Sequence, residues 1–337
     1  MGFDIIRGTN ISHWLSQSDA RGETRKSRFT RDDCRRLADL GLDHLRLPVD
    51  EEQLWTEDGT RENEAWDLLN EGLDWCADAG MRAVVDLHIL RSHHFVGDSD
   101  RRLLFHDDAV VARFADCWRD LSRGLCTRST DRVAYELMNE PVADDPADWN
   151  RVLRAPYHAI RENEPDRVIA VGSNKWNQTA TYPDFDPPTG DPNMILVFHY
   201  YNPMLVTHHQ ASWSHVGVYD GPIVYPGAPI PESAWDTLDP DMRDTFAHEN
   251  QHFDVGVMEE NLQPVLEKSR EMNLPLWCNE FGVITRAPDD IRHRWTRDLV
   301  SRLETHGIAW ANWDYRGDFG LFDRQDRPSV VLDALLG

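Results

Sequence analysis

Two glutamates are the residues of this chain whose surroundings best suit them for chemistry. Glu140 stands in the motif Asn-Glu-Pro and Glu280 in the motif Asn-Glu-Phe-Gly, and each follows a short apolar run. Such runs, bounded by polar residues, are typical of buried strands. The two glutamates lie far apart in the sequence, so only the fold could bring them together. Two carboxylates at the ends of two strands are what hydrolysis of a glycosidic bond by double displacement requires.

Polar and aromatic residues also end the other apolar runs. A single polar residue after a strand is commonly a loop residue or a helix cap. Polar and aromatic residues at the ends of six strands are difficult to explain by exposure to solvent alone. In a barrel of parallel strands, the carboxyl ends of the strands meet on one rim, and that rim carries the chemistry. Besides the two glutamates, the candidates are Arg46, His88, Asn139, His199, Tyr201 and Trp313.

β-Rich runs alternate with amphipathic stretches along the chain, which predicts an α/β fold, a single (β/α)₈ TIM barrel. Several runs are continuously apolar, as expected for parallel strands covered on both faces. The expected strands are Ile5–Thr9, Asp43–Val49, Arg82–His88, Arg132–Asn139, Arg167–Gly172, Met194–Tyr200, Pro275–Glu280 and Ile308–Trp313, and helical periodicity is clearest over Glu64–Ala79, Ala109–Leu125, Glu259–Met272 and Asp289–Thr305.

A doubly wound sheet is the competing fold. It would place a glycine-rich phosphate-binding turn after the first strand, and the segment Asn10–Trp14 contains no such turn. No linker interrupts the chain, so residues 1–337 are predicted to form one catalytic domain. The connection over about residues 202–255 is unusually long and rich in proline, glycine, histidine and aromatic residues. Because connections of this length are rare unless they are functional, we expect it beside the mouth of the active site, after the sixth strand.

The charge of the chain limits its partners. With 59 acidic and 35 basic residues the net charge is −24, which argues against binding to nucleic acid or to an anionic membrane surface. A neutral substrate is not repelled by such a field. All basic residues except Lys26, Lys175 and Lys268 are arginines. A salt-rich habitat and a GC-rich genome both explain this composition, and the oligomeric state is not indicated.

The cysteines and the N-terminal residues indicate in which cellular compartment the protein is expected. The five cysteines show no Cys-x-x-Cys spacing, which predicts reduced, mostly buried thiols and neither a disulfide framework nor a zinc finger. The first residues show no basic patch followed by an apolar stretch. We therefore expect no signal peptide and a cytoplasmic location, with a trimmed secreted protein as the alternative. No apolar run approaches the length of a transmembrane helix.

The motifs taken together resemble glycoside hydrolase family 5, the cellulase-type retaining glycosidases. The resemblance covers nearly the whole chain, and the motifs stand in the order and at the spacing of the family. Asn-Glu-Pro alone would be a weak signal, whereas the full set is specific. The matching motifs are Arg7–Trp14 (Arg-Gly-Thr-Asn-Ile-Ser-His-Trp), Leu45–Pro48 (Leu-Arg-Leu-Pro), Asp86–His88 (Asp-Leu-His), Asn139–Pro141 (Asn-Glu-Pro), His199–Tyr201 (His-Tyr-Tyr), Asn279–Gly282 (Asn-Glu-Phe-Gly) and Asn312–Trp313.

The resemblance implies a different role for each glutamate. Glu280 is the nucleophile and must be ionised, so a nearby cation, expected to be Arg46, should lower its pKa, with Tyr201 donating a hydrogen bond. Glu140 is the general acid/base, and burial together with the other carboxylate should raise its pKa. Glu136 has the same strand parity as Glu140 but lies four residues deeper, so it is expected to be an interior ion-pair or hydrogen-bond partner, for example of Arg46, and not a catalyst.

The remaining candidates are implied to surround the sugar. Asn139 should contact the 2-hydroxyl group, with His88 and His199 as further polar ligands, and Trp313 should provide an aromatic platform under the ring. For each of these residues the alternative is a buried side chain with a purely structural role. Weaker candidates for further subsites or for loops over the substrate are Trp14, His93, His94, Trp176, Trp213 and Tyr315.

Other chemistries are less consistent with the sequence. The paired histidines His93-His94 and His208-His209 do not have the spacing of a zinc site, so no metal is expected. A Gly-x-Ser-x-Gly elbow for a serine hydrolase is absent. Double displacement on two carboxylates needs no cofactor, and none is expected.

The sequence departs from the family after the third strand. Many members have a Pro-Gly turn there, whereas this chain continues with Ile89–His94, so the sugar subsites on that side are in question. If the 202–255 connection narrows the cleft, the enzyme trims chain ends or short oligosaccharides. The expected activity is that of a retaining β-glycosidase on β-glucan, cello-oligosaccharides or β-glucosides. A β-mannan or other β-glycan hydrolase, a transglycosylase and a carbohydrate-binding barrel without catalysis are the alternatives.

Overall fold

The computed structural model describes residues 2–96 and 103–337. Eight parallel strands form a closed barrel in sequential order, so the predicted (β/α)₈ fold is confirmed. Each predicted strand corresponds to an observed one. The strands are β1 (Arg7–Asn10), β2 (His44–Asp50), β3 (Arg82–Ile89), β4 (Val133–Glu136), β5 (Ile169–Gly172), β6 (Met194–Tyr200), β7 (Leu276–Phe281) and β8 (Ala309–Asn312).

The chain divides into two compact units. The first contains the described residues of Met1–His199 together with Pro264–Asn279 and Ala309–Ala311, and therefore nearly all of the barrel. The second contains Tyr200–Gln263, Glu280–Ile308 and Asn312–Gly337. The prediction that residues 1–337 form a single catalytic domain stays a prediction.

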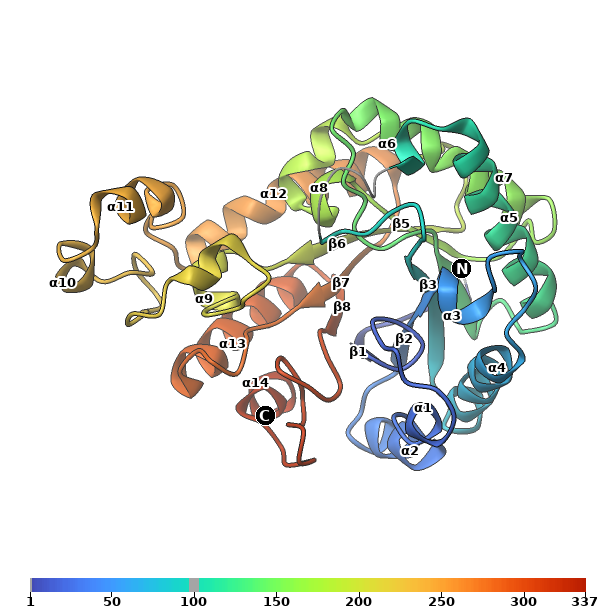
Figure 1. The fold of residues 1–337 in the computed structure, drawn as a ribbon, viewed down its shortest axis with the longest axis horizontal. Coiled ribbons are helices and arrows are strands. Elements are labelled where there is room, and N and C mark those ends of the chain that lie inside the picture. Colours follow the sequence, from blue (N-terminus) through green and yellow to red (C-terminus); the bar gives the residue numbers. More distant parts are fainter. Residues whose placement is uncertain (1, 97–102) are drawn as a thin grey trace. The chain divides into compact units, whose positions relative to one another are not determined.

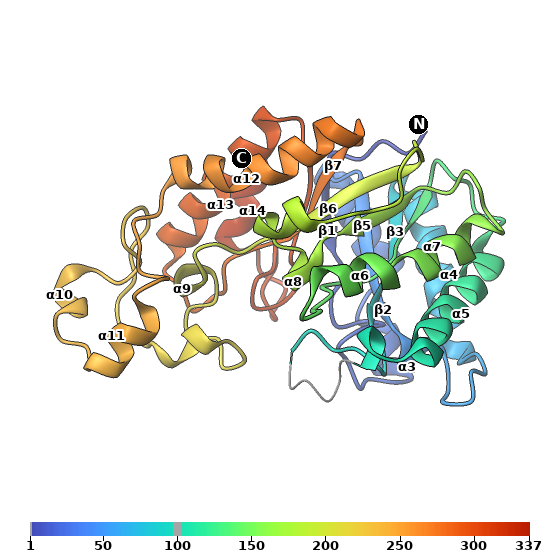
Figure 2. The ribbon, with the colours of Figure 1, turned by 90° about the horizontal axis from the view of Figure 1, so that it is seen from above.

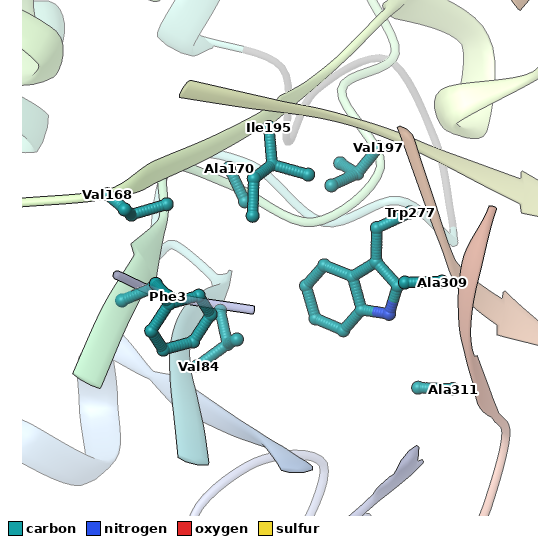
Figure 3. Packing of buried hydrophobic residues seen from close by; sticks show 10 residues of the cluster. Phe3, Val84, Val168, Ala170, Ile195, Val197, Trp277, Ala309 and Ala311 are labelled. Atoms are coloured by element: carbon teal, nitrogen blue, oxygen red, sulfur yellow. The ribbon is translucent and has the colours of Figure 1, made fainter. Parts of the chain in front are cut away.

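Side chains from the strands fill the interior of the barrel. Figure 3 shows them pointing toward one another, with Trp277 beside Ala309 and with Phe3, from the segment before β1, joining the cluster. Such a cluster of inward-facing side chains makes the inside of an eight-stranded barrel a packed core and not a pore. The cluster consists of Phe3, Val84, Ala134, Val168, Ala170, Ile195, Val197, Trp277, Ala309 and Ala311.

Helices of the first unit cover the outside of its strands (Figure 1, Figure 2). The predicted stripe on α4 is buried, including Trp66, Leu69 and Leu73, and α5 packs against α7. A capping box, in which Thr30 and Asp33 satisfy each other's backbone amides, begins α2. The helices are α1 (Glu23–Lys26), α2 (Arg31–Asp39), α3 (Glu51–Leu54), α4 (Asn63–Asp78), η2 (Leu103–Phe105), α5 (Asp108–Leu125), α6 (Pro146–Val152), α7 (Arg154–Arg161), α8 (Asn174–Asn177) and η3 (Thr179–Asp184).

The segment between β6 and α12 is not a loop without secondary structure. It contains several helices of one or two turns, coloured yellow to orange in Figure 1. In the same unit α13 packs against α14. The helices are α9 (Met204–Thr207), η4 (His215–Val218), α10 (Glu232–Trp235), α11 (Pro240–Phe246), α12 (Val255–Met272), α13 (Asp289–Thr305) and α14 (Val330–Leu336).

Two predicted boundaries differ from the observed ones by three or more residues. Strand β4 ends at Glu136 and not at Asn139. Irregular backbone follows, and it includes Glu140, whose left-handed φ of 42° is incompatible with a strand. Helix α12 begins at Val255, one turn before the predicted start.

All five cysteines are free and only Cys126 is exposed, so the prediction that most of the thiols are buried is confirmed, whereas their reduced state stays a prediction. Within the described residues, every helix is too short or too polar to cross a membrane.

Candidate active site

Arg46 is the centre of a buried hydrogen-bond network inside the first unit. Its Nε and Nη2 atoms donate to the two carboxylate oxygens of Glu136 at 2.6 and 2.9 Å, a bidentate pair with no exposed surface on either side chain. The prediction that Glu136 is an interior partner of Arg46 is therefore confirmed. Arg46 also donates to the Oδ1 atoms of Asn10 and Asn139, both at 2.9 Å. The side-chain amide of Asn279 donates to Glu136 at 2.8 Å.

Strand register explains this convergence. Asn10 pairs with Arg46 across β1 and β2, and Asp86 pairs with Glu136 across β3 and β4. Neighbouring residues in register point to the same face of a sheet, here the barrel interior. Asp86 consequently reaches Arg46, with 2.9 Å between Oδ2 and Nη2.

Two carboxyl groups thus face one guanidinium group. Burial raises the pKa of Asp86 and that of Glu136 to about 7 each, and Arg46 opposes this rise by favouring the ionised forms. Three N–H donors to Glu136 also stabilise its carboxylate and so lower its pKa. The pKa of Glu136 is raised nonetheless, because the effect of burial is larger than that of Arg46 and these hydrogen bonds. Near neutral pH the pair is expected to share a proton, which balances the single positive charge of Arg46.

His88 lies beside this network. Its Nδ1 atom is 2.6 Å from Asp86 Oδ2, and its ring meets Phe95 edge to face. Burial, and secondarily the positive charge of Arg46, hold the pKa of His88 well below its usual value. This shift favours the neutral imidazole, which can act as a hydrogen-bonding ligand.

Glu140 follows β4 and is 8% exposed. Its Oε1 atom is 2.8 Å from Nδ1 of His199, whose pKa is lowered by burial and by Arg46. The side-chain amide of Asn177 lies 3.4 Å from the other ring nitrogen of His199. A neutral His199 that accepts at Nε2 from Asn177 must donate from Nδ1 to Glu140.

The second unit contains Glu280 and the side chains around it. Glu280 stands near the end of β7 and is 5% exposed. Tyr201 donates its hydroxyl hydrogen to Glu280 Oε2 at 3.2 Å, as expected. The backbone carbonyl of Tyr201 accepts from Thr207 Oγ1 at 2.5 Å. The expectation that Arg46 is the cation beside Glu280 stays a prediction.

Trp313 follows β8 in the same unit. Its backbone amide donates to the carbonyl of Phe281 at 2.8 Å, and its half-buried side chain packs with Tyr201 against a small core of Ala211, Ile284 and Phe319. A partly exposed indole is compatible with the predicted sugar platform.

Among the weaker candidates, the prediction that Trp14 lines a subsite has to be corrected. It has no exposed surface and packs against Phe29 and Trp75, with ring centroids 5.2 and 6.4 Å away, so it is a core residue and does not line a subsite. Tyr315 is 2% exposed and packs edge to face on Phe322. Its ring is thus largely occupied by protein contacts.

The other weaker candidates lie on loops. His93 is 1% exposed and places Nε2 3.1 Å from the backbone carbonyl of Glu140. His94 stacks on Phe95. Trp176 is 38% exposed and donates from its indole to the carbonyl of Phe95 at 2.9 Å, whereas Trp213, in the second unit, is 49% exposed.

A pocket of 520 Å³ opens beside the loops that follow β1, β2 and β3. Its lining is mostly polar, which suits hydroxyl groups. The lining residues are Gln17, Ser18, Asp19, Asp50, Glu52, Ile89, Leu90, Arg91 and His94.

Sequence reasoning did not identify Asp86, Asn177 or Asn279 as members of these networks. Asp86 could have been found, because it stands two residues before His88 and strand periodicity puts both on one face. Asn177 gave no such signal, since it lies in α8, where three consecutive residues have positive φ values.

Comparison with known proteins adds an independent result. The model of the cellulase family, glycosyl hydrolase family 5, matches residues 7–318. Endoglucanase C of Acetivibrio thermocellus is 29% identical over 329 residues, which cover 95% of this chain and 94% of that protein. Cellodextrinase A of Ruminococcus flavefaciens is 25% identical over 307 residues, covering 90% and 84%.

Solved structures share the fold. A hyperthermophilic endo-β-1,4-glucanase in complex with substrate superposes with a TM-score of 0.77 at 20% identity, covering 98% of this chain and 96% of that one. Cel5A of Thermotoga maritima in complex with mannotriose gives 0.79 at 20% identity, covering 98% and 97%.

Proposed function

Because the chain belongs to glycosyl hydrolase family 5, we propose that it hydrolyses β-1,4-linked glucans and short cello-oligosaccharides by double displacement with retention. The observation that carries this proposal is the match of the family model over residues 7–318, which includes both glutamate motifs. Two relatives of near full-length coverage are named an endoglucanase and a cellodextrinase. Those names support a β-glucan substrate for this chain.

We propose a different role for each of the two glutamates. In the first step Glu280 attacks the anomeric carbon, while Glu140 transfers its proton to the leaving oxygen. In the second step Glu140 takes a proton from water, and that water displaces Glu280 from the sugar. The Tyr201 hydroxyl, 3.2 Å from Glu280, stabilises the carboxylate as nucleophile and as leaving group. The His199 bond at 2.8 Å orients the carboxyl group of Glu140.

Asn139 supports the proposed contact with the sugar 2-hydroxyl. Its Oδ1 atom is used by Arg46, whereas its buried Nδ2 atom has no hydrogen-bond partner in the part of the chain that the structure describes. Buried amide donors are nearly always satisfied, so a donor left over in this position is suited to a ligand oxygen. His88 and Trp313 are proposed to contact the same sugar ring, and the pocket lined in part by His94 is proposed to accept further sugar units.

The first experiment is a product profile. Purified protein is incubated with cello-oligosaccharides and, separately, with manno-oligosaccharides, beside the variants Glu140→Gln and Glu280→Gln. We expect cleavage of the cello series, slowed about 100- to 10,000-fold in Glu140→Gln and more in Glu280→Gln. Product lengths distinguish internal cutting from trimming of chain ends.

Three outcomes would contradict parts of the proposal. Cleavage of the manno series alone would assign β-mannan as the substrate. Full activity in either variant would show that the substituted glutamate does not have the catalytic role proposed for it. Binding of both series without cleavage would favour a carbohydrate-binding barrel, and a mechanism-based 2-fluoro cellobioside that leaves Glu280 unlabelled would decide for it.

A further inference from the structure

The segment that carries Glu140 is held from two sides inside the first unit. From the loop after β3, Nε2 of His93 lies 3.1 Å from the carbonyl oxygen of Glu140. From the loop after β5, the Trp176 amide donates to the carbonyl of Pro141 at 3.2 Å. Asn174 makes two bonds with the backbone of Ala143, at 2.8 and 2.9 Å. The residues after β4 are thus fixed to both neighbouring loops.

The backbone of Glu140 needs such support. Its φ of 42° lies in the left-handed region, which is rare for residues other than glycine, asparagine and aspartate. Such a conformation is strained and persists only where the surroundings enforce it. The strained backbone thus belongs to Glu140, the residue proposed to donate and accept the proton.

His93 is itself rigidly placed. Leu90 and His93 exchange two backbone hydrogen bonds of 3.1 Å, which closes a tight turn directly after β3. The ring is 1% exposed and packs edge to face on Phe105, 5.2 Å between centroids. Because a carbonyl oxygen can only accept, Nε2 must carry the hydrogen. This turn lies within the stretch in which the chain departs from the Pro-Gly pattern of many family members.

We propose that His93 is a positioning residue for the acid/base step, and this inference rests on the function proposed above. Its Nε2–H bond to the Glu140 carbonyl holds the left-handed backbone, and that backbone aims the carboxyl group at the leaving oxygen. Small displacements of a catalytic group cost large factors in rate. The loss should therefore appear in proton transfer to the leaving group and not in sugar binding.

The test uses aryl β-cellobiosides with different leaving groups. His93→Phe keeps the ring on Phe105 but removes the donor, and His93→Gln retains an amide donor of similar reach. For the 4-methylphenyl glycoside, which needs protonation, kcat/KM should fall about tenfold or more in His93→Phe. For the 2,4-dinitrophenyl glycoside, which leaves without a proton, kcat/KM should stay within about threefold, while kcat and KM fall together because the second step is slowed. His93→Gln should restore most of the lost rate.

The matched control is His44→Phe. His44 is another buried histidine, at the start of β2, bonded to Asp43 at 2.6 Å and packed edge to face on Trp277. Its replacement should change thermal stability without any dependence on the leaving group. If phenylalanine is not tolerated at position 93, the shorter His93→Asn removes the same bond.

Equal losses on both glycosides in His93→Phe, or no recovery in His93→Gln, would overturn the inference. Glu140→Gln, measured in parallel, separates this failure from that of the proposed function. A strong dependence on the leaving group in Glu140→Gln with none in His93→Phe would reject only the role of His93. No dependence in Glu140→Gln would reject the assignment of Glu140 and the role of His93 with it.

Discussion

At the scale of single residues, one buried guanidinium group faces two buried carboxyl groups, so the charges would be unequal if both acids were ionised. Arg46 faces both Asp86 and Glu136, and none of the three side chains has exposed surface. Removing one partner from a buried ionic cluster is costly because it leaves a charge uncompensated. A shared proton solves this problem by letting the two acids carry about one negative charge between them.

This arrangement predicts a pH-dependent contribution to stability. The pKa of Glu136 is about 7 in the folded chain, against 4.5 when unperturbed, so the native state holds more protons than the unfolded state between these values. The free energy of unfolding contributed by Glu136 therefore falls as pH rises from about 4.5 to 7, by roughly 3 kcal/mol at most, and is constant above that range. Glu136→Gln cannot titrate, so it should lack this fall.

The measurement is the difference between wild type and Glu136→Gln in urea unfolding at about pH 5 and pH 8. A difference is needed because buried histidines such as His88 and His199, whose pKa values are lowered, contribute a slope of the opposite sign below about pH 6.5. Asp58→Asn is the control. The pKa of that exposed carboxyl is lowered to about 2, so its contribution does not change above pH 5. An identical pH dependence in wild type and Glu136→Gln would contradict the shared proton.

The sequence predicted some of these residues and missed others for a physical reason. Strand parity was sufficient to place Glu136 in the interior with Arg46 as its partner. The contact of His93 with the Glu140 carbonyl depends on a turn in one loop and a left-handed residue in another, and neither has a periodic signature. Trp14 was misplaced for a related reason, because its environment is created by Phe29 and by residues of α4, which no local pattern around Trp14 reports.

At the scale of elements, regular structure was predictable where it is long and strongly patterned. All eight strands were found, several of them because strands covered on both faces give continuous apolar runs, as in β6. The helices between β6 and α12 were not, since α9 and α10 have four residues each and show no full helical period. Their positions follow from tertiary packing, which a local pattern cannot report.

Helix α4 provides a test of the corrected position of Trp14. A β-carbon at Gly72 would lie 2.8 Å from the Trp14 ring, closer than atoms can pack. Alanine normally stabilises a helix by about 1 kcal/mol relative to glycine, but here Gly72→Ala should destabilise the protein by about 1–3 kcal/mol through overpacking. Urea unfolding measures the change. The adjacent exposed Glu71→Ala should be close to neutral, and stabilisation by Gly72→Ala would show that Trp14 is free to move away.

At the scale of the whole molecule, family membership and fold follow from motifs spread over the chain, whereas the choice of sugar does not. Solved structures with the same fold include an endo-β-1,4-glucanase in complex with substrate and a Cel5A in complex with mannotriose. The residues of the catalytic motifs are expected to contact only the sugar at the cleaved bond. We propose that specificity for neighbouring sugar units depends on loops such as those around the polar pocket after β1, β2 and β3, where the sequence has no repeating pattern.

The net charge of −24 acts on the molecule as a whole and predicts a response to salt. Added salt screens the attraction within surface pairs such as Arg61–Asp120 and Arg154–Asp186, and it also screens the repulsion among surplus acids. Exposed pairs contribute little individually, and 59 acidic residues face only 35 basic ones. The relief of repulsion should therefore dominate, so Tm at about pH 8 should rise between about 0.05 and 1 M NaCl, as the Debye length falls to about 3 Å.

The same measurement near pH 4.9, the isoelectric point of the sequence, separates charge repulsion from other effects of salt. There the surplus charge is neutralised, so only the weakening of favourable pairs remains, and Tm should stay constant or fall as salt is added. An equal rise at both pH values would mean that salt acts through apolar burial and not through charge. No rise at pH 8 would mean that the acidic side chains are spaced widely enough on the surface for water alone to screen them.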